Sequence, residues 1–198
     1  MGSQERKLRE KEALKQSMLS AAINIAKSEG WQAVTIRKIA DAIDYSAPIV
    51  YEHFTNKEDL IAEIIHQGYK QMLGSFREVV IQNMTPDELL LEISLRHWDF
   101  AMENKVLFQL MFSLEREHPR DDFMNVLTAI RNTFAKTTQK EGQELDSIIF
   151  NWVCLMSGTI TTLMLIEEKK HKPPHELNIS PKELYRSFIL RFLKSIHD

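Results

Sequence analysis

The sequence predicts an all-α protein. Only 6 of its 198 residues are glycine and 6 are proline, so few positions interrupt a helix. Between these breaks, apolar residues recur at the helical spacing of three and four positions, and no segment shows the strict alternation of a half-buried strand. With 43% hydrophobic residues, the chain can bury a substantial core in one or two domains.

The first predicted helix is long and the second is short. The long helix runs from near Lys7 to Glu29 and ends at Gly30, a residue type that readily adopts the left-handed backbone of a helix end. Thr35 is placed to cap the short helix, because its hydroxyl can accept from an N–H of the first turn. The apolar face of this short helix consists of Ile36, Ile39, Ala40 and Ile43.

Another short helix follows a turn at residues 44–45. Ser46 is placed to cap it, and Pro48 lies in its first turn, where a missing N–H costs little. Val50 and Phe54 form its single narrow buried edge. A helix this short is not stable alone, so its neighbours must hold it while most of its surface stays exposed. Two short helices around a tight turn are typical of a helix-turn-helix DNA reader.

The rest of the chain predicts a second helical domain. Asn56 caps a long helix that reaches about Gln82, and its apolar stripe is longer than a three-helix head can cover. We therefore expect this helix to link a DNA-binding domain at residues 1–56 to a ligand-binding and dimerisation domain at residues 57–198. Further helices are expected near 85–104, 106–114, 122–139, 146–166 and 180–196, with capping boxes at Thr85 and Ser180 and loops at 115–121 and 169–179.

The segment from Thr35 to Leu60 resembles the signature of the tetracycline-repressor family of bacterial regulators. The matching residues are Thr35, Ile39-Ala40, Asp44-Tyr45-Ser46, Val50-Tyr51, His53-Phe54, Asn56-Lys57 and Leu60, preceded by Ala21-Ala22, Ile25-Ala26, Glu29-Gly30 and Trp31. Two positions depart from the pattern: Asp44 replaces the usual glycine of the turn, and Ile49 replaces the usual threonine of the recognition helix. Asp enters the left-handed backbone more readily than most residues.

Ten residues are expected to contact DNA: Thr35, Arg37, Lys38, Ser46, Ala47, Pro48, Ile49, Tyr51, His53 and Lys57. Arg37 and Lys38 lie in the first turn of a helix, where cations oppose the helix dipole, and this placement favours a phosphate or base partner. By resemblance, Arg37 aligns with a base-reading arginine, which can grip a guanine edge.

The remaining DNA contacts are expected to be with phosphates and thymine methyl groups. By resemblance, Tyr51, His53 and Lys57 correspond to the positions with which the family holds the DNA backbone. Residues 47–49 offer only apolar surface, and their expected partner in the major groove is a thymine methyl.

The second domain is rich in large, soft side chains. Most of these must form the core, but Trp and Met crowded onto several helices also line adaptable apolar pockets, and the resemblance implies an inducer cavity here. The residues expected to line a site for a small apolar or amphipathic ligand are Trp98, Met102, Phe108, Met111, Phe112, Phe134, Trp152 and Met156. The polar groups best placed to orient the ligand are Arg96, Asn151, Ser157 and Thr161.

A homodimer is expected through the last two long helices. Residues 148–166 are apolar nearly all round, so this helix needs a partner on two sides. Gly158 and Thr162 would allow close helix approach, and Phe188 and Phe192 belong to a matching stripe on the last helix. The resemblance implies that these helices pair with those of a second copy. Polar residues interrupt the stretch, so a membrane partner is not expected.

Other classes of function are poorly supported. Cys154 is the single cysteine and cannot form an intrachain disulfide, which fits a reducing cytoplasm, and no apolar signal segment begins the sequence. His171 and His175 flank two prolines in a loop, so a metal site is not expected, and no catalytic residues or cofactor are predicted. A net charge of −3 and a pI of 6.2 argue against a protein that coats DNA without specificity, but only weakly against a dimer with a small local DNA footprint.

The sequence therefore predicts a transcriptional repressor that a small molecule releases from a palindromic, double-stranded operator. Two alternatives stay open. One is a regulator gated by a protein partner, and the other is a helical ligand-binding or scaffold protein that has lost DNA binding.

Overall fold

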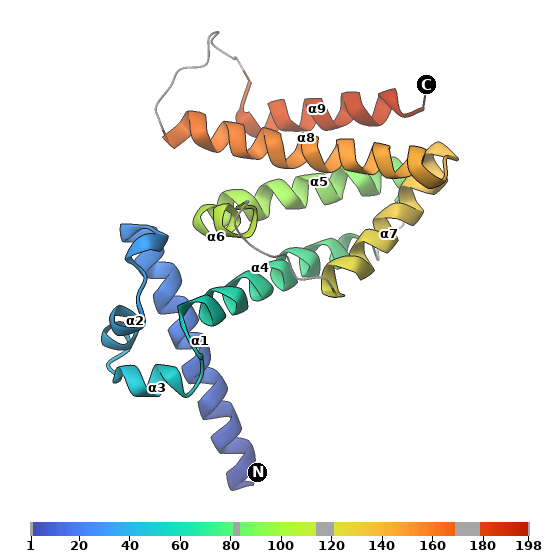
Figure 1. Cartoon of the computed structure of the whole chain (residues 1–198). Coiled ribbons are helices and arrows are strands. Elements are labelled where there is room, and N and C mark those ends of the chain that lie inside the picture. Colours follow the sequence, from blue (N-terminus) through green and yellow to red (C-terminus); the bar gives the residue numbers. More distant parts are fainter. Residues whose placement is uncertain (1, 81–83, 114–120, 169–178, 198) are drawn as a thin grey trace. The chain divides into compact units, whose positions relative to one another are not determined.

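The described part of the chain is entirely helical in its regular structure, which confirms the predicted all-α class (Figure 1). The computed structural model describes residues 2–80, 84–113, 121–168 and 179–197. The chain divides into two compact units, Met1–Gln67 and Gly68–Asp198, and the division falls inside helix α4 (Lys57–Val80).

The first unit consists of α1 (Ser3–Glu29), a 3₁₀ turn η1 (Trp31–Ala33), α2 (Ile36–Ala42), α3 (Ala47–Tyr51) and the beginning of α4. Gly30 ends α1 as predicted: its φ is 83°, and its N–H donates to the carbonyl of Ala26 at 2.9 Å. The turn η1 was not predicted, because three residues are too few to show a periodic pattern.

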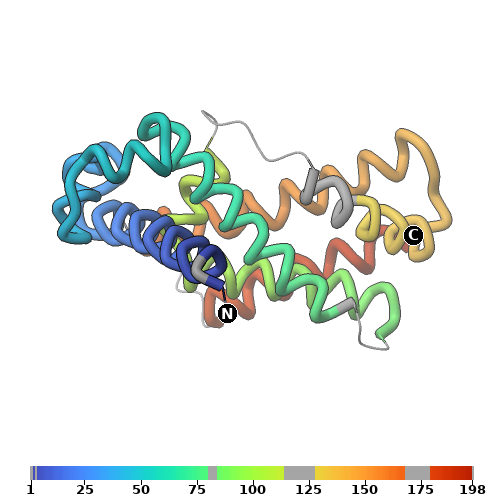
Figure 2. Tube along the Cα trace, turned by 90° about the horizontal axis from the view of Figure 1, so that it is seen from below, coloured from blue at the N-terminus to red at the C-terminus, as the bar shows by residue number. Residues whose placement is uncertain are grey.

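The core of the first unit lies between the C-terminal half of α1 and the short helices. Its fully or nearly fully buried members include Met18, Ala22, Ala26, Val34, Ile39, Val50, Phe54, Leu60 and Ile64. The N-terminal half of α1 extends past α2 and α3 (Figure 2). Its side chains are exposed from Gln4 to Ala13, and the Arg6 guanidinium pairs with Glu10 one turn away at 2.9 Å. The charged residues between Glu5 and Glu12 therefore form a solvated helix face.

The second unit contains the rest of α4 and five further helices: α5 (Pro86–Glu103), α6 (Lys105–Met111), α7 (Asp121–Thr138), α8 (Gly142–Glu168) and α9 (Pro181–Ser195). Helix α5 is central, since it packs against α6, α7, α8 and α9, while α8 and α9 lie side by side (Figure 1). Both predicted capping boxes are present, at Thr85 with Glu88 and at Ser180 with Glu183.

Two boundaries in the second unit bear on the predictions. Helix α8 begins at Gly142, about one turn before the expected start at Asp146, and the left-handed Gly142 (φ 56°) and Gln139 (φ 55°) lie at the corner after α7. The predicted loops at 115–121 and 169–179, with His171 and His175, lie almost entirely outside the described residues.

Helix α8 carries the most apolar stretch of the described chain. Among the described residues it is the one helix, over Gly142–Glu167, long and apolar enough to cross a membrane, and 22% of its most apolar window is buried. The core helix of a soluble protein can meet the same criteria of length and composition. What distinguishes α8 is that much of its apolar surface remains uncovered in the single chain.

Candidate functional site

Helix α2 has a buried face and an exposed face. The Thr35 hydroxyl accepts from the Lys38 N–H at 3.2 Å, which confirms the predicted cap. Ile39 is fully buried, so the helix is held by its inner side. On the outer side, Arg37 is exposed and forms no ion pair or hydrogen bond with the described part of the chain. By contrast, the Lys38 ammonium lies 2.5 Å from the Glu29 carboxylate. Of these two cations, Arg37 is therefore the one available to a partner.

The turn between α2 and α3 depends on a left-handed aspartate. Asp44 has a φ of 59°, as its replacement of glycine required, and the Tyr45 N–H closes the turn by donating to the Ala40 carbonyl at 3.0 Å. Ser46 occupies the N-cap position of α3, but its hydroxyl accepts no hydrogen bond from the helix. The prediction that Ser46 stands at the N-cap is therefore confirmed, but the predicted hydrogen bond from its hydroxyl to the helix is absent. The exposed hydroxyl remains available to a partner outside the chain.

Helix α3 presents most of its surface outward. Val50 is 0% exposed and Phe54 is 3% exposed, which confirms the predicted narrow buried edge. Tyr51 is 56% exposed and Pro48 is also exposed. Among the other predicted contact residues, Ala47, Ile49 and His53 are half-buried, so part of each side chain faces the surface.

Lys57 has a contact within the head that the sequence did not reveal. Its ammonium donates to the Trp31 carbonyl at 3.1 Å, which ties the first turn of α4 to the beginning of η1. Asn56 caps this turn by accepting from the Asp59 N–H at 2.8 Å, as predicted. Lys57 is half-buried, so its charge is partly used inside the head.

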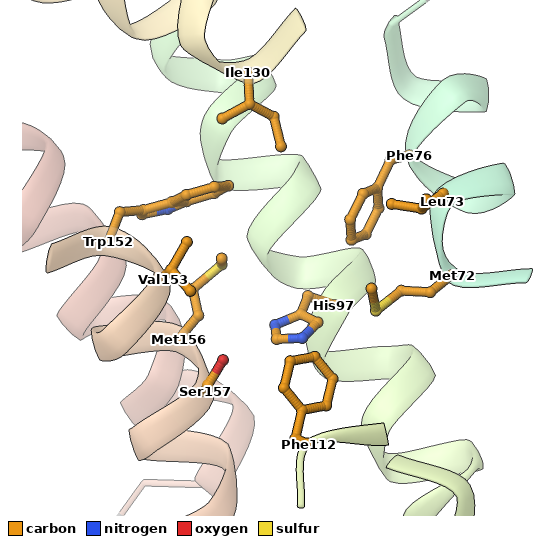
Figure 3. A pocket seen from close by; sticks show the side chains of 10 residues that line it. All are labelled: Met72, Leu73, Phe76, His97, Phe112, Ile130, Trp152, Val153, Met156 and Ser157. Carbon is orange, nitrogen blue, oxygen red and sulfur yellow. The ribbon is translucent and has the colours of Figure 1, made fainter. Parts of the chain in front are cut away.

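The second unit contains a cavity between α4, α5, α7 and α8, with Phe112 at the end of α6 (Figure 3). Its lining residues are Met72, Leu73, Phe76, His97, Phe112, Ile130, Trp152, Val153, Met156 and Ser157. Three of the eight residues predicted for a ligand site are among them, namely Phe112, Trp152 and Met156. Ser157, one of the predicted polar groups, also lines the cavity, and in Figure 3 its hydroxyl points toward the side of His97 and Phe112.

The other five predicted ligand residues do not line this cavity. The Trp98 ring packs on Tyr185 with centroids 5.1 Å apart, and the Phe134 ring meets Trp152 edge-on at 5.2 Å. Phe108 stacks on Phe112 at 4.4 Å. Met111 is fully buried, and Met102 is half-buried. These residues belong to the packing around the cavity or to other parts of the core.

The polar groups predicted to orient a ligand are separated by the fold. Arg96 pairs with Glu92 one turn away at 3.0 Å, while Asn151 and Thr161 are exposed on α8. Sequence reasoning overlooked His97, which is 3% exposed and lines the cavity. Burial lowers the pKa of His97 to about 4, because the charged imidazolium is poorly solvated there.

The outer face of α8 combines small residues with exposed apolar side chains. Gly158 and Thr162 are exposed, and a Cβ added at Gly158 would have no neighbour within 4 Å. Phe150 is 69% exposed and Leu165 is 46% exposed on this helix, and Leu190 of α9 is 39% exposed. The two predicted dimer residues of α9, Phe188 and Phe192, are only half-buried. The exposed apolar residues that the sequence did not single out are Phe150, Leu165 and Leu190.

Within the described residues, no group of three or more histidine, cysteine, aspartate or glutamate side chains is arranged to hold a metal ion. Cys154 is exposed on α8, although the sequence placed it among apolar residues.

Similarity to known proteins is concentrated in the helix-turn-helix region. Residues 18–64, which include α2 and α3, match the model of the bacterial regulatory proteins of the tetR family. The chain is 31% identical over 67 residues to the HTH-type transcriptional repressor KstR2 of Rhodococcus jostii, covering 34% of this chain and 33% of that protein. It is 23% identical over 111 residues to the KstR2 repressor of Mycolicibacterium smegmatis, covering 54% of each. The matches thus span about a third to about half of these relatives.

The fold is similar over nearly the whole chain to a transcriptional regulator of the TetR/AcrR family from Thermobifida fusca. The TM-score is 0.64 at 17% identity, and the alignment covers 90% of this chain and 96% of that one. The family match includes α2 and α3, the helices that carry the cap at Thr35, the turn at Asp44 and the buried edge at Val50 and Phe54. The helix-turn-helix region of this chain, over residues 18–64, is therefore similar to that of the tetR family of bacterial regulatory proteins.

Proposed function

We infer that this chain is a DNA-binding transcriptional repressor of the cytoplasm, acting as a homodimer on a palindromic operator and released by a small apolar or amphipathic molecule. The observation that carries this function is the pair α2 and α3. Their inner faces are buried at Ile39 and Val50, while Arg37 and Tyr51 are exposed. A short helix held from one side and exposed on the other is suited to enter a major groove.

Within this function, the exposed groups divide by role. Arg37 is free of internal partners among the described residues and would read a base, since a guanidinium can bind the O6 and N7 of guanine together. The Ser46 hydroxyl and the Tyr51 phenol would donate to phosphates. Lys38 and Lys57 would add charge near the backbone while keeping their contacts to Glu29 and Trp31.

A second copy of the chain supplies the second head. One head contacts only half of a palindromic site, so specific binding needs two. The exposed apolar groups on α8 and α9, with Gly158 among them, form a surface that an identical chain can cover. Removing such a patch from water favours association.

Ligand control would act through α4. This helix is continuous from Lys57 to Val80, and its residues Met72, Leu73 and Phe76 line the cavity. A ligand in the cavity therefore touches the same helix whose first turns belong to the DNA-binding head. If it binds better to a state whose head spacing does not fit the operator, it shifts the population away from DNA.

The test is selection of DNA sites from a randomised library, followed by affinity measurements at several salt concentrations. Wild-type protein should select a palindrome with half-sites about one helical turn apart. Arg37→Ala should relax the preference at one position per half-site and cost about 1–3 kcal/mol of binding free energy. Arg77→Ala, which removes another exposed arginine outside the head, should change neither.

Failure of the wild-type protein to select any sequence would favour the helical ligand-binding or scaffold protein. An unchanged preference in Arg37→Ala would remove this residue from base reading. Selection of an operator without response to any small molecule would favour a regulator gated by a protein partner.

A further inference from the structure

The cavity in the second unit is apolar except at two residues. His97 extends from α5 into the space between α4 and α8, and Ser157 faces it from α8 (Figure 3). His97 is 3% exposed, and within the described structure its Nδ1 has no hydrogen-bond partner. Buried polar atoms are nearly always bonded, so an exception in a residue that lines a cavity points to a partner that the cavity would hold.

Aromatic rings hold the His97 imidazole on several sides. Its centroid lies 5.4 Å from that of Phe108, 5.6 Å from that of Phe112 and 6.5 Å from that of Phe76. None of these rings offers a conventional hydrogen bond. Because burial holds the pKa of His97 near 4, the imidazole is neutral at neutral pH and has one donor and one acceptor nitrogen. A hydroxyl group can both donate and accept, so it can satisfy Nδ1 in either tautomer.

We propose that His97 is the hydrogen-bonding anchor of a small, uncharged ligand that consists of one apolar ring and a hydroxyl group. The proposal rests on the proposed function only in placing the ligand site in this cavity. The apolar body would pack between Met72 and Phe76 of α4 and Trp152 and Met156 of α8.

The charge of the ligand follows from the lining. The ten lining residues include no lysine and no arginine, and the single titratable group among them is the neutral His97. A carboxylate placed here would lose its hydration without gaining a counter-ion. The cavity therefore selects a neutral alcohol or phenol over an acid of the same shape.

The size of the ligand follows from the free space. The cavity leaves about 50 Å³ for the centres of water-sized molecules, and about 450 Å³ of empty space when the part open to solvent is included. The smaller value favours a single ring over a fused ring system. Met72 and Met156 have flexible side chains that can adjust to its outline.

Three probes of matched shape test the anchor: 4-ethylphenol, 4-ethyltoluene, which replaces the hydroxyl by a methyl group, and 4-ethylbenzoate, which adds a charge. Binding to the full chain is measured by calorimetry and by the fluorescence of the tryptophans, of which Trp152 lines the cavity. We expect 4-ethylphenol to bind on the order of tenfold more tightly than 4-ethyltoluene, because it alone satisfies Nδ1. The benzoate should bind most weakly.

Two variants assign the preference to His97. His97→Phe keeps an aromatic ring but removes both nitrogens, and it should reverse the order so that 4-ethyltoluene binds more tightly than 4-ethylphenol. Ser157→Ala removes the other polar group and should retain the preference for the phenol. In wild-type protein, 4-ethylphenol should also shift the ring nitrogen resonances of His97, a readout that needs no variant.

The proposal is overturned if wild-type protein binds none of the probes, binds the phenol no better than the toluene, or prefers the benzoate. It is also overturned if Ser157→Ala, rather than His97→Phe, removes the preference. These measurements need no DNA. If the protein selects an operator but does not discriminate between the probes, the role of His97 is refuted and the proposed repressor function is retained. If the probes are discriminated and no operator is selected, the repressor fails and the anchor stands.

Discussion

The indole N–H of Trp152 donates to the hydroxyl oxygen of Ser94 at 3.1 Å, which joins α8 to α5 inside the second unit. The Ser94 hydroxyl donates in turn to the Leu90 carbonyl at 2.7 Å, and the Tyr185 hydroxyl donates to the Ser94 carbonyl at 3.0 Å. All four residues are buried. With its N–H bound at Ser94, Trp152 contributes only apolar ring surface to the cavity.

Ser94→Ala should destabilise the chain by about 1–3 kcal/mol, because it leaves the buried Trp152 N–H without a partner. Urea denaturation followed by far-UV circular dichroism measures the change. Ser187→Ala is the matched control: its hydroxyl donates only to the Leu184 carbonyl at 2.8 Å in a half-buried position, so its loss should cost much less. Equal losses in the free energy of unfolding for the two variants would show that the hydrogen bond from Trp152 to Ser94 does not stabilise the fold more than an ordinary serine contact.

The stability of the chain should fall on mild acidification because of His97. Its folded-state pKa of about 4 lies below the ordinary 6.5, so between these values the unfolded chain binds a proton that the folded chain does not. This lowers the free energy of unfolding as pH falls through that window, by about 1.5 kcal/mol between pH 6.5 and pH 5. The slope fades above pH 6.5 and is nearly gone about one pH unit higher, where the imidazole is neutral in both states.

His97→Phe should lose this slope, whatever its absolute stability. The comparison is made above pH 5 because Glu88 and Glu183, whose pKa values are lowered by hydrogen bonds from Thr85 and Ser180, lose their stabilising charge at lower pH. Parallel curves of stability against pH for the variant and the wild type would mean that His97 is not held neutral by burial.

Two helical glycines of α4 should respond oppositely to alanine. A Cβ at Gly68 would lie 2.6 Å from the Met111 sulfur and 3.2 Å from a Leu107 methyl carbon, whereas at Gly74 it would meet nothing within 4 Å. Met111 is fully buried and Leu107 nearly so, which leaves little room for either to move. Gly74→Ala should therefore stabilise the chain by about 0.5–1 kcal/mol through helix propensity.

In Gly68→Ala the clash should outweigh that gain, with a net loss of about 1–2 kcal/mol. Thermal or urea denaturation of the two variants gives the comparison. Stabilisation by both substitutions would show that Met111 can be displaced at little cost.

Local signals in the sequence were sufficient to predict the helix-turn-helix unit. The cap at Thr35, the left-handed Asp44 and the buried edge at Val50 and Phe54 each depend on residues within one or two turns, and all were predicted. The contact from Lys57 to the Trp31 carbonyl was not, because it joins residues 26 positions apart.

The cavity was harder to predict, for a reason that lies in α5. This helix packs against four others, so apolar residues surround it and periodicity does not show which side faces the cavity. Trp98 turns to Tyr185, while its neighbour in sequence, His97, turns to the cavity. A single buried histidine beside a tryptophan carries no pattern that distinguishes it from the core.

The outer face of α8 should form the dimer, and Gly158→Leu tests it. A Cβ at this exposed position meets nothing within 4 Å in the single chain, so the fold should be unaffected, but a leucine side chain would hold a second helix away. Sedimentation should show a shift from dimer to monomer, and operator binding should be lost with it. Gly74→Leu is the matched control, since it adds the same side chain at another open helical glycine and should remain dimeric. On α9, Leu190→Glu tests the same dimer interface, because Leu190 is exposed. A change at Phe192 would also disturb the core, since its ring contacts Phe134 with centroids 6.4 Å apart.

The single cysteine provides a second measurement on the same surface. Cys154 is exposed on α8 one turn before Gly158, so a maleimide should label it quickly in the monomer and slowly once a partner helix covers it. The rate should therefore fall as the protein concentration rises through the dimer dissociation constant, and Gly158→Leu should remove this dependence. A labelling rate that is independent of concentration in a protein that sediments as a dimer would place the interface elsewhere. In that case Gly158→Leu should still bind the operator as a dimer. This result would distinguish an interface elsewhere on the chain from a protein that does not dimerise.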